Sequence, residues 1–214
     1  MTFERVMICD DQAAKVANLA KEILQDSAMV IEVVSMKFSE NNELGIAKFE
    51  ARLVEISDNK PKKQNIQGEG VGLLDACFDA MLKGYEHNYC SLSSISIVDF
   101  TLNAHVDGGN ERKSDAKVTA LLRVKNSEAH EYCFQCTTTS ISHSSILVVE
   151  EAFVFFINAE LAYERLYKAW ADAKERGRHD LIDRYRNQMA LLVHATSYEK
   201  LVKKLRQEQN EGLY

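Results

Sequence analysis

The chain has 214 residues and a net charge of −6, which suits one sizeable domain with an appendage and argues against a nucleic-acid binder, because such proteins need a clustered basic face. No apolar run approaches the ~20 residues that a membrane-spanning helix requires, and the N-terminus lacks the pattern of a secretory signal. We therefore expect a cytoplasmic protein with neither nucleic acid nor a membrane as its partner.

Residues 1–28 predict a short strand and an amphipathic helix ahead of the main domain. The strand is expected at Val6–Cys9 and the helix over residues 13–24, with Asp10 or Asp11 as its N-cap. An apolar strand that ends in two acidic residues is also typical of a phosphoacceptor receiver domain. The residues that follow lack the strand–helix alternation of that fold, which favours a simple packing helix.

From residue 29 the hydrophobic pattern changes to a period of two, which predicts β-strands. Three strands are expected, over residues 30–38, 47–53 and 62–67. One face of the first is expected to carry Val30, Glu32, Val34, Met36 and Phe38. An apolar stripe with helical spacing then predicts a helix over residues 74–85, so that this unit reads β-β-β-α.

The same order of elements returns in the second half of the chain. Strands are expected over residues 98–106, 116–124 and 132–138. The first of them is expected to be half-buried through a face of Val98, Phe100, Leu102, Ala104 and Val106. A Ser-rich turn follows, with Ser144 or Ser145 as the N-cap of a helix that is apolar nearly all round and ends near Tyr163. Two such units predict an α+β fold in which helices cover the sheets.

A glycine-rich turn joins the third strand to the first of these helices, with Gly68, Gly70 and Gly72 at alternate positions. Glycine lets the backbone approach a neighbour or a ligand closely. The free N–H groups at the start of the following helix, together with the helix dipole, form a seat for a carboxylate. A turn of this kind also serves simply to connect a strand to a helix, and this explanation stays open.

The amino-acid sequence of this turn resembles a motif of a known family. Residues 68–76 read Gly-Glu-Gly-Val-Gly-Leu-Leu-Asp-Ala, which is similar to the Gly-x-Gly-Asn-Gly-Pro-Val-Asp-Ala segment in the leucine-responsive regulatory domain of the 2-isopropylmalate synthase and citramalate synthase family. The likeness covers about residues 29–163, including the order of elements and a Ser-rich turn before the second helix. Val71 stands where the family usually has Asn, and Leu73 where it usually has Pro.

The resemblance implies a non-catalytic, homodimeric regulatory domain that stands alone without its synthase barrel. It implies an amino-acid effector, leucine or a relative, bound near the subunit interface, a role in leucine biosynthesis, and a separate catalytic subunit as a possible partner. Because Val71 replaces a polar Asn, the ligand would be held by backbone N–H groups. The ligand-binding residues that the resemblance implies are Gly70, Val71, Gly72, Leu73, Leu74, Thr101, Ala104, Ala116, Val118 and Ile141.

Residues 164–214 predict further helices, with a helix stop at Gly177. Their apolar stripes and basic faces allow two interpretations, a hairpin that binds a partner or dimerises, and an amphipathic cover for the sheet domain. The first interpretation supports an alternative function, a protein-interaction module that docks a separate partner through these helices while the ligand pocket is closed or repurposed.

The sequence predicts no catalytic residue, cofactor or metal site. The six histidines are scattered singly, without the His-x-His motif of the resembling synthases. The five cysteines are expected to be free, and Cys133 and Cys136, although spaced as in redox and metal motifs, should point to opposite faces of a strand. The serines around His143 lack a nucleophile elbow. An enzyme built on the duplicated scaffold, with an unidentified reaction, remains a further alternative.

Overall fold

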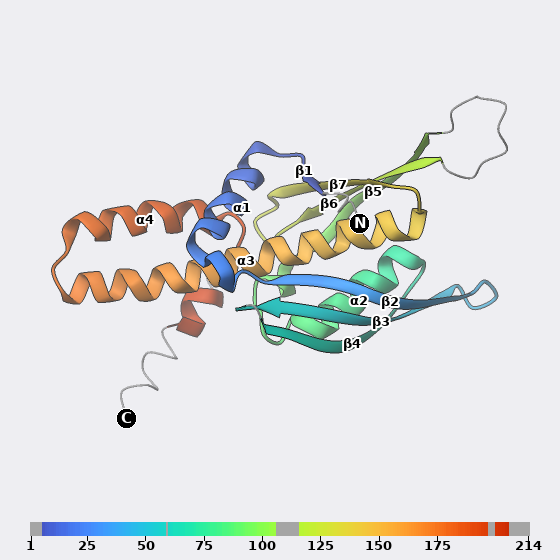
Figure 1. The fold of residues 1–214 in the computed structure, drawn as a ribbon, viewed down its shortest axis with the longest axis horizontal. Helices are drawn as coiled ribbons and strands as arrows, with labels where there is room; N and C mark the ends of the chain where they lie inside the picture. The colour runs from blue at the N-terminus through green and yellow to red at the C-terminus, as the bar shows by residue number, and fades with distance from the viewer. Residues whose placement is uncertain (1–5, 59, 106–115, 197–199, 206–214) are drawn as a thin grey trace.

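The computed structural model describes residues 6–58, 60–105, 116–196 and 200–205 (Figure 1). The elements in the first half are β1 (Met7–Ile8), α1 (Asp11–Leu24), the short 3-10 helix η1 (Gln25–Ser27), β2 (Val30–Asn41), β3 (Ile46–Ser57), β4 (Lys60–Gly70) and α2 (Leu73–Tyr85). Those in the second half are the 3-10 helix η2 (Leu92–Ser94), β5 (Ser96–His105), β6 (Lys117–Lys125), β7 (Glu131–Thr138), α3 (Ile141–Glu175) and α4 (His179–Val193). This mixture of helices and antiparallel strands confirms the predicted α+β class.

The strands form two antiparallel sheets, one from each predicted unit. The first has the order β2-β3-β4, and the second has the order β1-β7-β6-β5. The short N-terminal strand β1 joins the second sheet, with Met7 opposite Gln135 on β7. Each unit is therefore a three-stranded antiparallel meander followed by its helix, in the order that the alternating pattern predicts.

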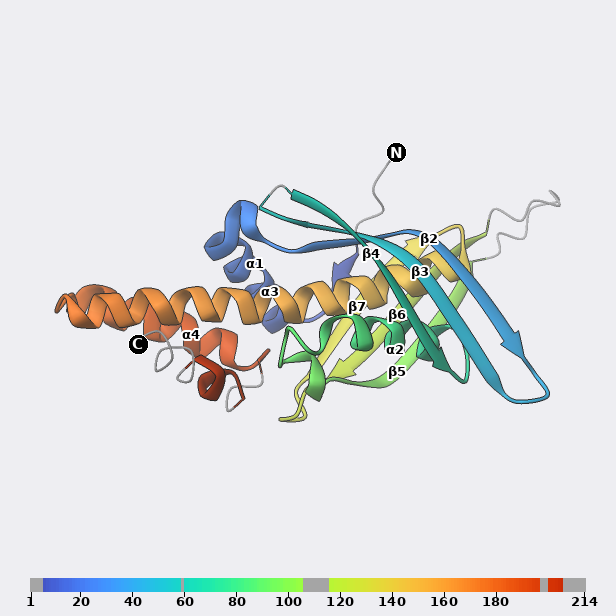
Figure 2. The same ribbon diagram turned by 90° about the horizontal axis from the view of Figure 1, so that it is seen from below.

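The long helix α3 runs lengthwise between the two sheets (Figure 2). It packs on β6 and β7 of its own unit and on α1, α2 and β2 of the preceding part of the chain. Phe153 and Phe156 are fully buried, and the Phe153 ring meets the Phe78 ring of α2 edge to face at 5.1 Å between centroids. An apolar surface nearly all round this helix is what such a position requires.

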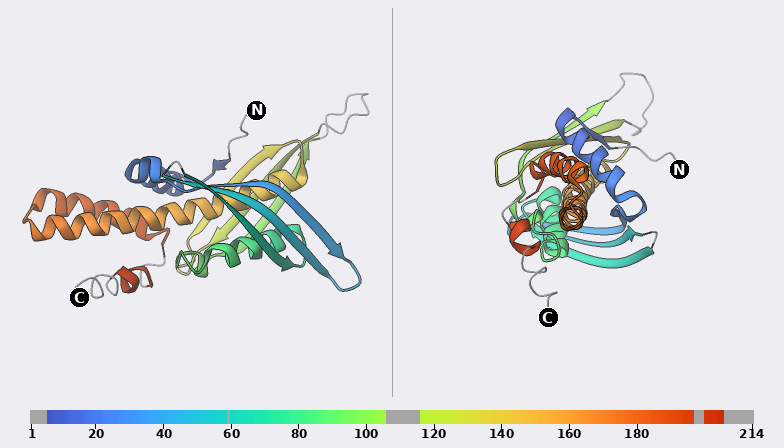
Figure 3. Two further views of the ribbon diagram at one scale, coloured as in Figure 1. Left: turned by 60° about the horizontal axis from the view of Figure 1, so that its bottom comes forward. Right: turned by 90° about the vertical axis from the view of Figure 1, so that its left-hand side faces the viewer.

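The C-terminal helices cover α3. Helix α3 continues to Glu175, past the expected end near Tyr163, because α4 folds back along its C-terminal part (Figure 3). Gly177, with φ +65°, lies in the turn between the two helices, as predicted for a helix stop. Met189 and Leu192 of α4 are buried, so the apolar stripe is used within the chain. Among the described residues, no helix combines the length and apolar character needed to cross a membrane.

One strand face was predicted wrongly because of a β-bulge. The register between β2 and β3 shifts between Val33 and Ser35, and this shift exchanges the two faces of the strand. Ile31 is buried, whereas Val30 and Val34 are each 50% exposed. A strict period of two cannot reveal an extra residue of this kind.

Two helix caps and one proline within a strand also define the local structure. Asp10, one of the two expected caps, accepts hydrogen bonds from the backbone N–H groups of Gln12 and Ala13 at the start of α1. Helix α3 is capped by Ser140, earlier than the expected Ser144 or Ser145. Pro61 lies inside β4, which an edge strand tolerates because its outer N–H positions need no partner.

Candidate ligand site at the starts of helices α2 and α3

Two of the three glycines of the turn are explained by packing. An added Cβ at Gly68 would lie 2.3 Å from the backbone nitrogen of Ala80, and one at Gly70 would lie 2.6 Å from that of Ala76. Glycine at these positions lets β4 and α2 approach more closely than any side chain allows. Gly72 is different, because a Cβ added there would have no atom within 4 Å and its φ of −155° is ordinary extended backbone.

The start of α2 has no side-chain cap. Gly72 occupies the N-cap position, and its carbonyl accepts the first helical hydrogen bond from the Ala76 N–H at 3.0 Å. The preceding Val71 is 73% exposed, and the first-turn Asp75 is also exposed. An uncapped helix start of this kind provides N–H groups and a positive dipole end for an anion.

The start of α3, unlike that of α2, has a side-chain cap. The Ser140 side chain accepts from the His143 N–H at 3.3 Å. The Ser144 hydroxyl donates to the Val118 carbonyl at 3.1 Å and lies 2.8 Å from the Thr138 hydroxyl. The Ser-rich turn therefore fixes α3 to β6 and β7, and it offers an exposed apolar side chain, Ile141, at 56% exposure.

Helices α2 and α3 start at the same end of the molecule. Phe78 near the start of α2 contacts Phe153, and Cys90 after α2 contacts Glu160 farther along α3, so the two helices run in the same direction. Figure 1 and Figure 2 agree that both starts lie toward the end at which β5 finishes. The glycine-rich turn and Ile141 therefore belong to one end of the fold.

The strand residues of the expected site are only partly brought together. Ala104 on β5 lies opposite Val118 on β6, so these two side chains share one face of the sheet. Thr101, three residues from Ala104, lies on the other face and is exposed. Ala116 is half-buried just before β6, and Val118 is buried beneath the α3 start. The predicted set therefore faces two sides of the second sheet.

The inner face of β5 is apolar and only partly covered, because Phe100 packs against the core. Phe100 and Leu102 lie opposite Leu122 and Ala120, which α3 buries completely. Leu102 is nevertheless 39% exposed, because α3 covers β6 and β7 rather than β5. The expected half-buried face is thus more open than predicted. Its first member, Val98, lies at a register shift between Ile97 and Asp99 and so does not share the face of Phe100, and its last member, Val106, lies outside the described residues.

A hollow of about 490 Å³ opens across the middle of the first sheet, lined by residues 35–37, 50–52 and 65–67. None of the residues implied by the resemblance lines it. The exposed Val71 and Asp75 place the start of α2 at the surface of the described part of the subunit, and a ligand bound there needs a further wall to exclude water.

Two buried carboxylates on α3 hold neighbouring segments in place. Glu150 accepts a hydrogen bond from the Val33 N–H at 2.7 Å. Burial raises the pKa of Glu150 to about 7, although this hydrogen bond lowers it, and the carboxylates of Glu32 and Glu151 add to the rise. Glu160 is fully buried and accepts from the Ser91 N–H at 2.7 Å. Both carboxylates bind backbone N–H groups, which assigns them a structural role.

The cysteines behave as predicted for free thiols. Cys136 is buried on the inner face of β7, whereas Cys133 lies on the outer face beside Cys9, which follows β1 and whose N–H donates to the Cys133 carbonyl at 2.9 Å. Cys133 and Cys136 therefore do not combine into one site.

Sequence reasoning missed one cluster of side chains. Glu128, His130 and His194 come together between the β6–β7 turn and the end of α4, although the histidines are far apart in sequence. The sequence shows only the spacing of Glu128 and His130 on a turn, and the partner from the end of α4 depends on the tertiary fold. No protein-family model matches this chain, and no curated protein matches its sequence.

Proposed function

We propose that this chain is a non-catalytic regulatory domain that forms a homodimer and binds an amino-acid-like effector beside the subunit interface. The observation that carries the proposal is the uncapped start of α2, which lies at the same end of the fold as exposed Ile141 and the end of β5, whose inner face is only partly covered. The free thiols fit a reducing compartment, and we propose the cytoplasm as the location.

The chemistry at the start of α2 favours a zwitterion with an aliphatic side chain. Its backbone N–H groups suit a carboxylate. The exposed carboxylate of Asp75 in the first turn suits an ammonium group. Val71 and Ile141 offer apolar surface to the side chain of the ligand. Leucine or a close relative meets all three requirements, in keeping with the resemblance of the glycine-rich turn.

The second sheet favours a second copy of the chain as the missing wall. In the first unit, α3 covers the start of β2, where Ile31 is buried. The corresponding strand of the second unit, β5, keeps Leu102 39% exposed on the face that it shares with Phe100. A two-fold dimer that covers this apolar face would bury it and would also close the open surface at the start of α2.

The structure gives less support to docking through the C-terminal helices. Among the described residues, every exposed large hydrophobic side chain lies at or before Ile141. The apolar stripe of α4 packs on α3, with Met189 and Leu192 buried. A partner that bound this hairpin would therefore meet mainly polar and basic side chains, and we rank this function second.

Thermal unfolding with and without effectors tests the proposal. A ligand at 100 times its Kd stabilises the folded state by about 2.7 kcal/mol, so leucine or a relative should give a saturable shift in Tm. Gly72→Asp places a carboxylate on the N–H groups of α2 and should abolish the shift. Gly72→Ala, which fills open space without a competing charge, should retain it. The proposal fails if no branched-chain amino acid, 2-keto acid or 2-hydroxy acid shifts the Tm, or if Gly72→Asp binds as the wild type does.

A further inference from the structure

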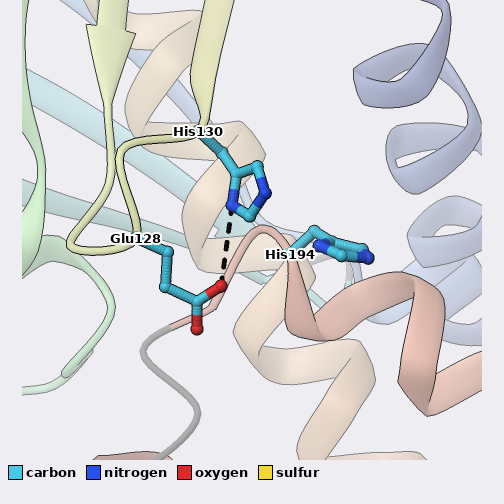
Figure 4. Close-up of side chains that lie close together, drawn as sticks. All are labelled: Glu128, His130 and His194. Carbon is cyan, nitrogen blue, oxygen red and sulfur yellow. Dashed lines mark ion pairs between the residues drawn. The ribbon is translucent and has the colours of Figure 1, made fainter.

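The cluster of Glu128, His130 and His194 has the composition of a metal site (Figure 4). One potential ligand atom from each residue lies within 4.8 Å of the others. The Nδ1 atom of His130 lies 3.6 Å from a carboxylate oxygen of Glu128. The two imidazole rings meet edge to face at 5.1 Å between centroids. All three side chains are exposed, so an ion has direct access from solvent.

The turn that carries Glu128 and His130 is held rigidly by one buried side chain. The side-chain oxygen of Asn126 accepts from the backbone N–H groups of Glu128 and His130, each at 3.0 Å. The Asn126 N–H donates to the His130 carbonyl at 3.1 Å, which closes the turn. Both side chains therefore project from a fixed backbone.

The same asparagine fixes the third member of the cluster. The Asn126 side-chain NH₂ group donates to the backbone carbonyl of His194 at 2.6 Å, and the Tyr132 hydroxyl donates to the same oxygen. This carbonyl lies at the C-cap of α4. A network of buried and half-buried groups thus sets the distance between α4 and the β6–β7 turn without any help from an ion.

We propose that Glu128, His130 and His194 bind a divalent transition-metal ion of the zinc type. Two imidazole nitrogens and one carboxylate oxygen are donors that Zn²⁺ accepts, whereas Ca²⁺ and Mg²⁺ require oxygen ligands. Zinc bonds of about 2.0–2.2 Å bring tetrahedral ligand atoms to about 3.3 Å from one another. Exposed side chains can close this gap by χ rotation alone. The remaining coordination position is open to water or to a ligand from another molecule.

The ion would connect α4 to the second sheet. Because the three ligands assemble only in the folded chain, zinc should raise the Tm of the protein. This site is remote from the glycine-rich turn in the chain and does not depend on the proposed effector.

Zinc titration of the full chain, freed of metal by a chelator, tests the proposal. Isothermal titration with Zn²⁺ alone should give one site, and His130→Gln, His194→Gln and Glu128→Gln should each weaken it by about tenfold or more. His179→Gln, at the other end of α4, is the matched control and should bind as the wild type does. Measurements in a Cys9→Ser, Cys133→Ser background keep thiols from competing for the ion.

Two further readouts separate metal binding from a structural effect of the substitutions. Without zinc, the His194→Gln and wild-type proteins should unfold at similar temperatures, since the His194 carbonyl contacts are kept. With zinc, only the wild type and the His179→Gln control should gain stability. No zinc binding at micromolar concentration, or binding that survives His130→Gln and His194→Gln together, would overturn the proposal.

Discussion

The backbone N–H of Val33 donates to the buried carboxylate of Glu150 across 2.7 Å, at the bulge where β2 changes its faces. The bulge frees this N–H from the ladder, and α3 supplies the acceptor. The bond fixes the edge strand of the first sheet to the central helix. A buried carboxylate in this position makes folding dependent on pH.

The stability of the protein should fall as the pH rises through the range in which Glu150 ionises. Burial raises the pKa of Glu150 from 4.5 to about 7, so the folded state holds its proton more tightly than the unfolded state. The contribution of Glu150 to the free energy of unfolding is highest below pH 4.5, declines between pH 4.5 and about 7, and is constant at higher pH. Glu150→Gln keeps an acceptor for the Val33 N–H and removes this pH dependence. It should raise the free energy of unfolding at pH 8 by on the order of 1–3 kcal/mol.

Urea unfolding at pH 5 and pH 8 measures this difference. The stability of Glu150→Gln relative to wild type should be greater at pH 8 than at pH 5. Glu22→Gln, an exposed position on α1, controls for the loss of one acidic residue. An equal difference at both pH values would contradict the assignment of the raised pKa to Glu150.

The three glycines of the turn should respond differently to alanine. Gly68→Ala and Gly70→Ala force a Cβ to within 2.6 Å of the α2 backbone or closer, and each should destabilise the fold by about 1–3 kcal/mol. Gly72→Ala should be nearly neutral, because its Cβ meets open space. Gly72→Asp should raise the free energy of unfolding by a few tenths of a kcal/mol, because the new side chain caps α2. Chemical denaturation checks the series, and a large loss in Gly72→Ala would contradict this account of the turn.

Local signals in the sequence are sufficient to predict the helices and strands. They also predict two of the three helix caps and stops. The alternation along β6 and β7 predicts the buried Leu122 and Phe134, and Gly177 predicts a helix stop. The faces of β2 and β5 were predicted less well. Register shifts after Val33 and after Ile97 exchange the faces of β2 and β5, and whether β5 is covered depends on how far α3 reaches.

The candidate sites show the same limit. Gly68 and Gly70 stand out in the sequence as unusual residues, yet only the position of α2 shows that they serve packing. His130 and His194 come from segments separated by all of α3 and α4, so no local spacing relates them. Properties that depend on contacts between distant segments could not be predicted from the order of residues.

The partly covered apolar face of β5 that carries Phe100 and Leu102 should mediate self-association. Leu102→Glu places a charge at the centre of the proposed dimer interface and should convert a dimer into a monomer while leaving the fold intact, because Leu102 is already 39% exposed. Leu44→Glu, in the β2–β3 turn at 69% exposure, is the matched control and should remain dimeric. Light scattering coupled to size-exclusion chromatography distinguishes the two. A monomeric wild type, or a Leu102→Glu dimer of equal stability, would contradict the proposed interface.

The cysteines should react with a thiol reagent in an order set by burial. Cys9 is exposed and should be alkylated first. Burial and the neighbouring Cys9 thiol raise the pKa of Cys133 to about 11, and burial and Glu160 raise that of Cys90 to about 12, so both thiols are largely protonated at pH 8 and should react slowly. Cys77 and Cys136 are buried and should react only on unfolding.

Mass spectrometry of N-ethylmaleimide adducts over time resolves the order. Because the thiolate is the reacting species, raising the pH from 8 to 9.5 should accelerate labelling of Cys133 strongly, and labelling that ignores pH would contradict its raised pKa.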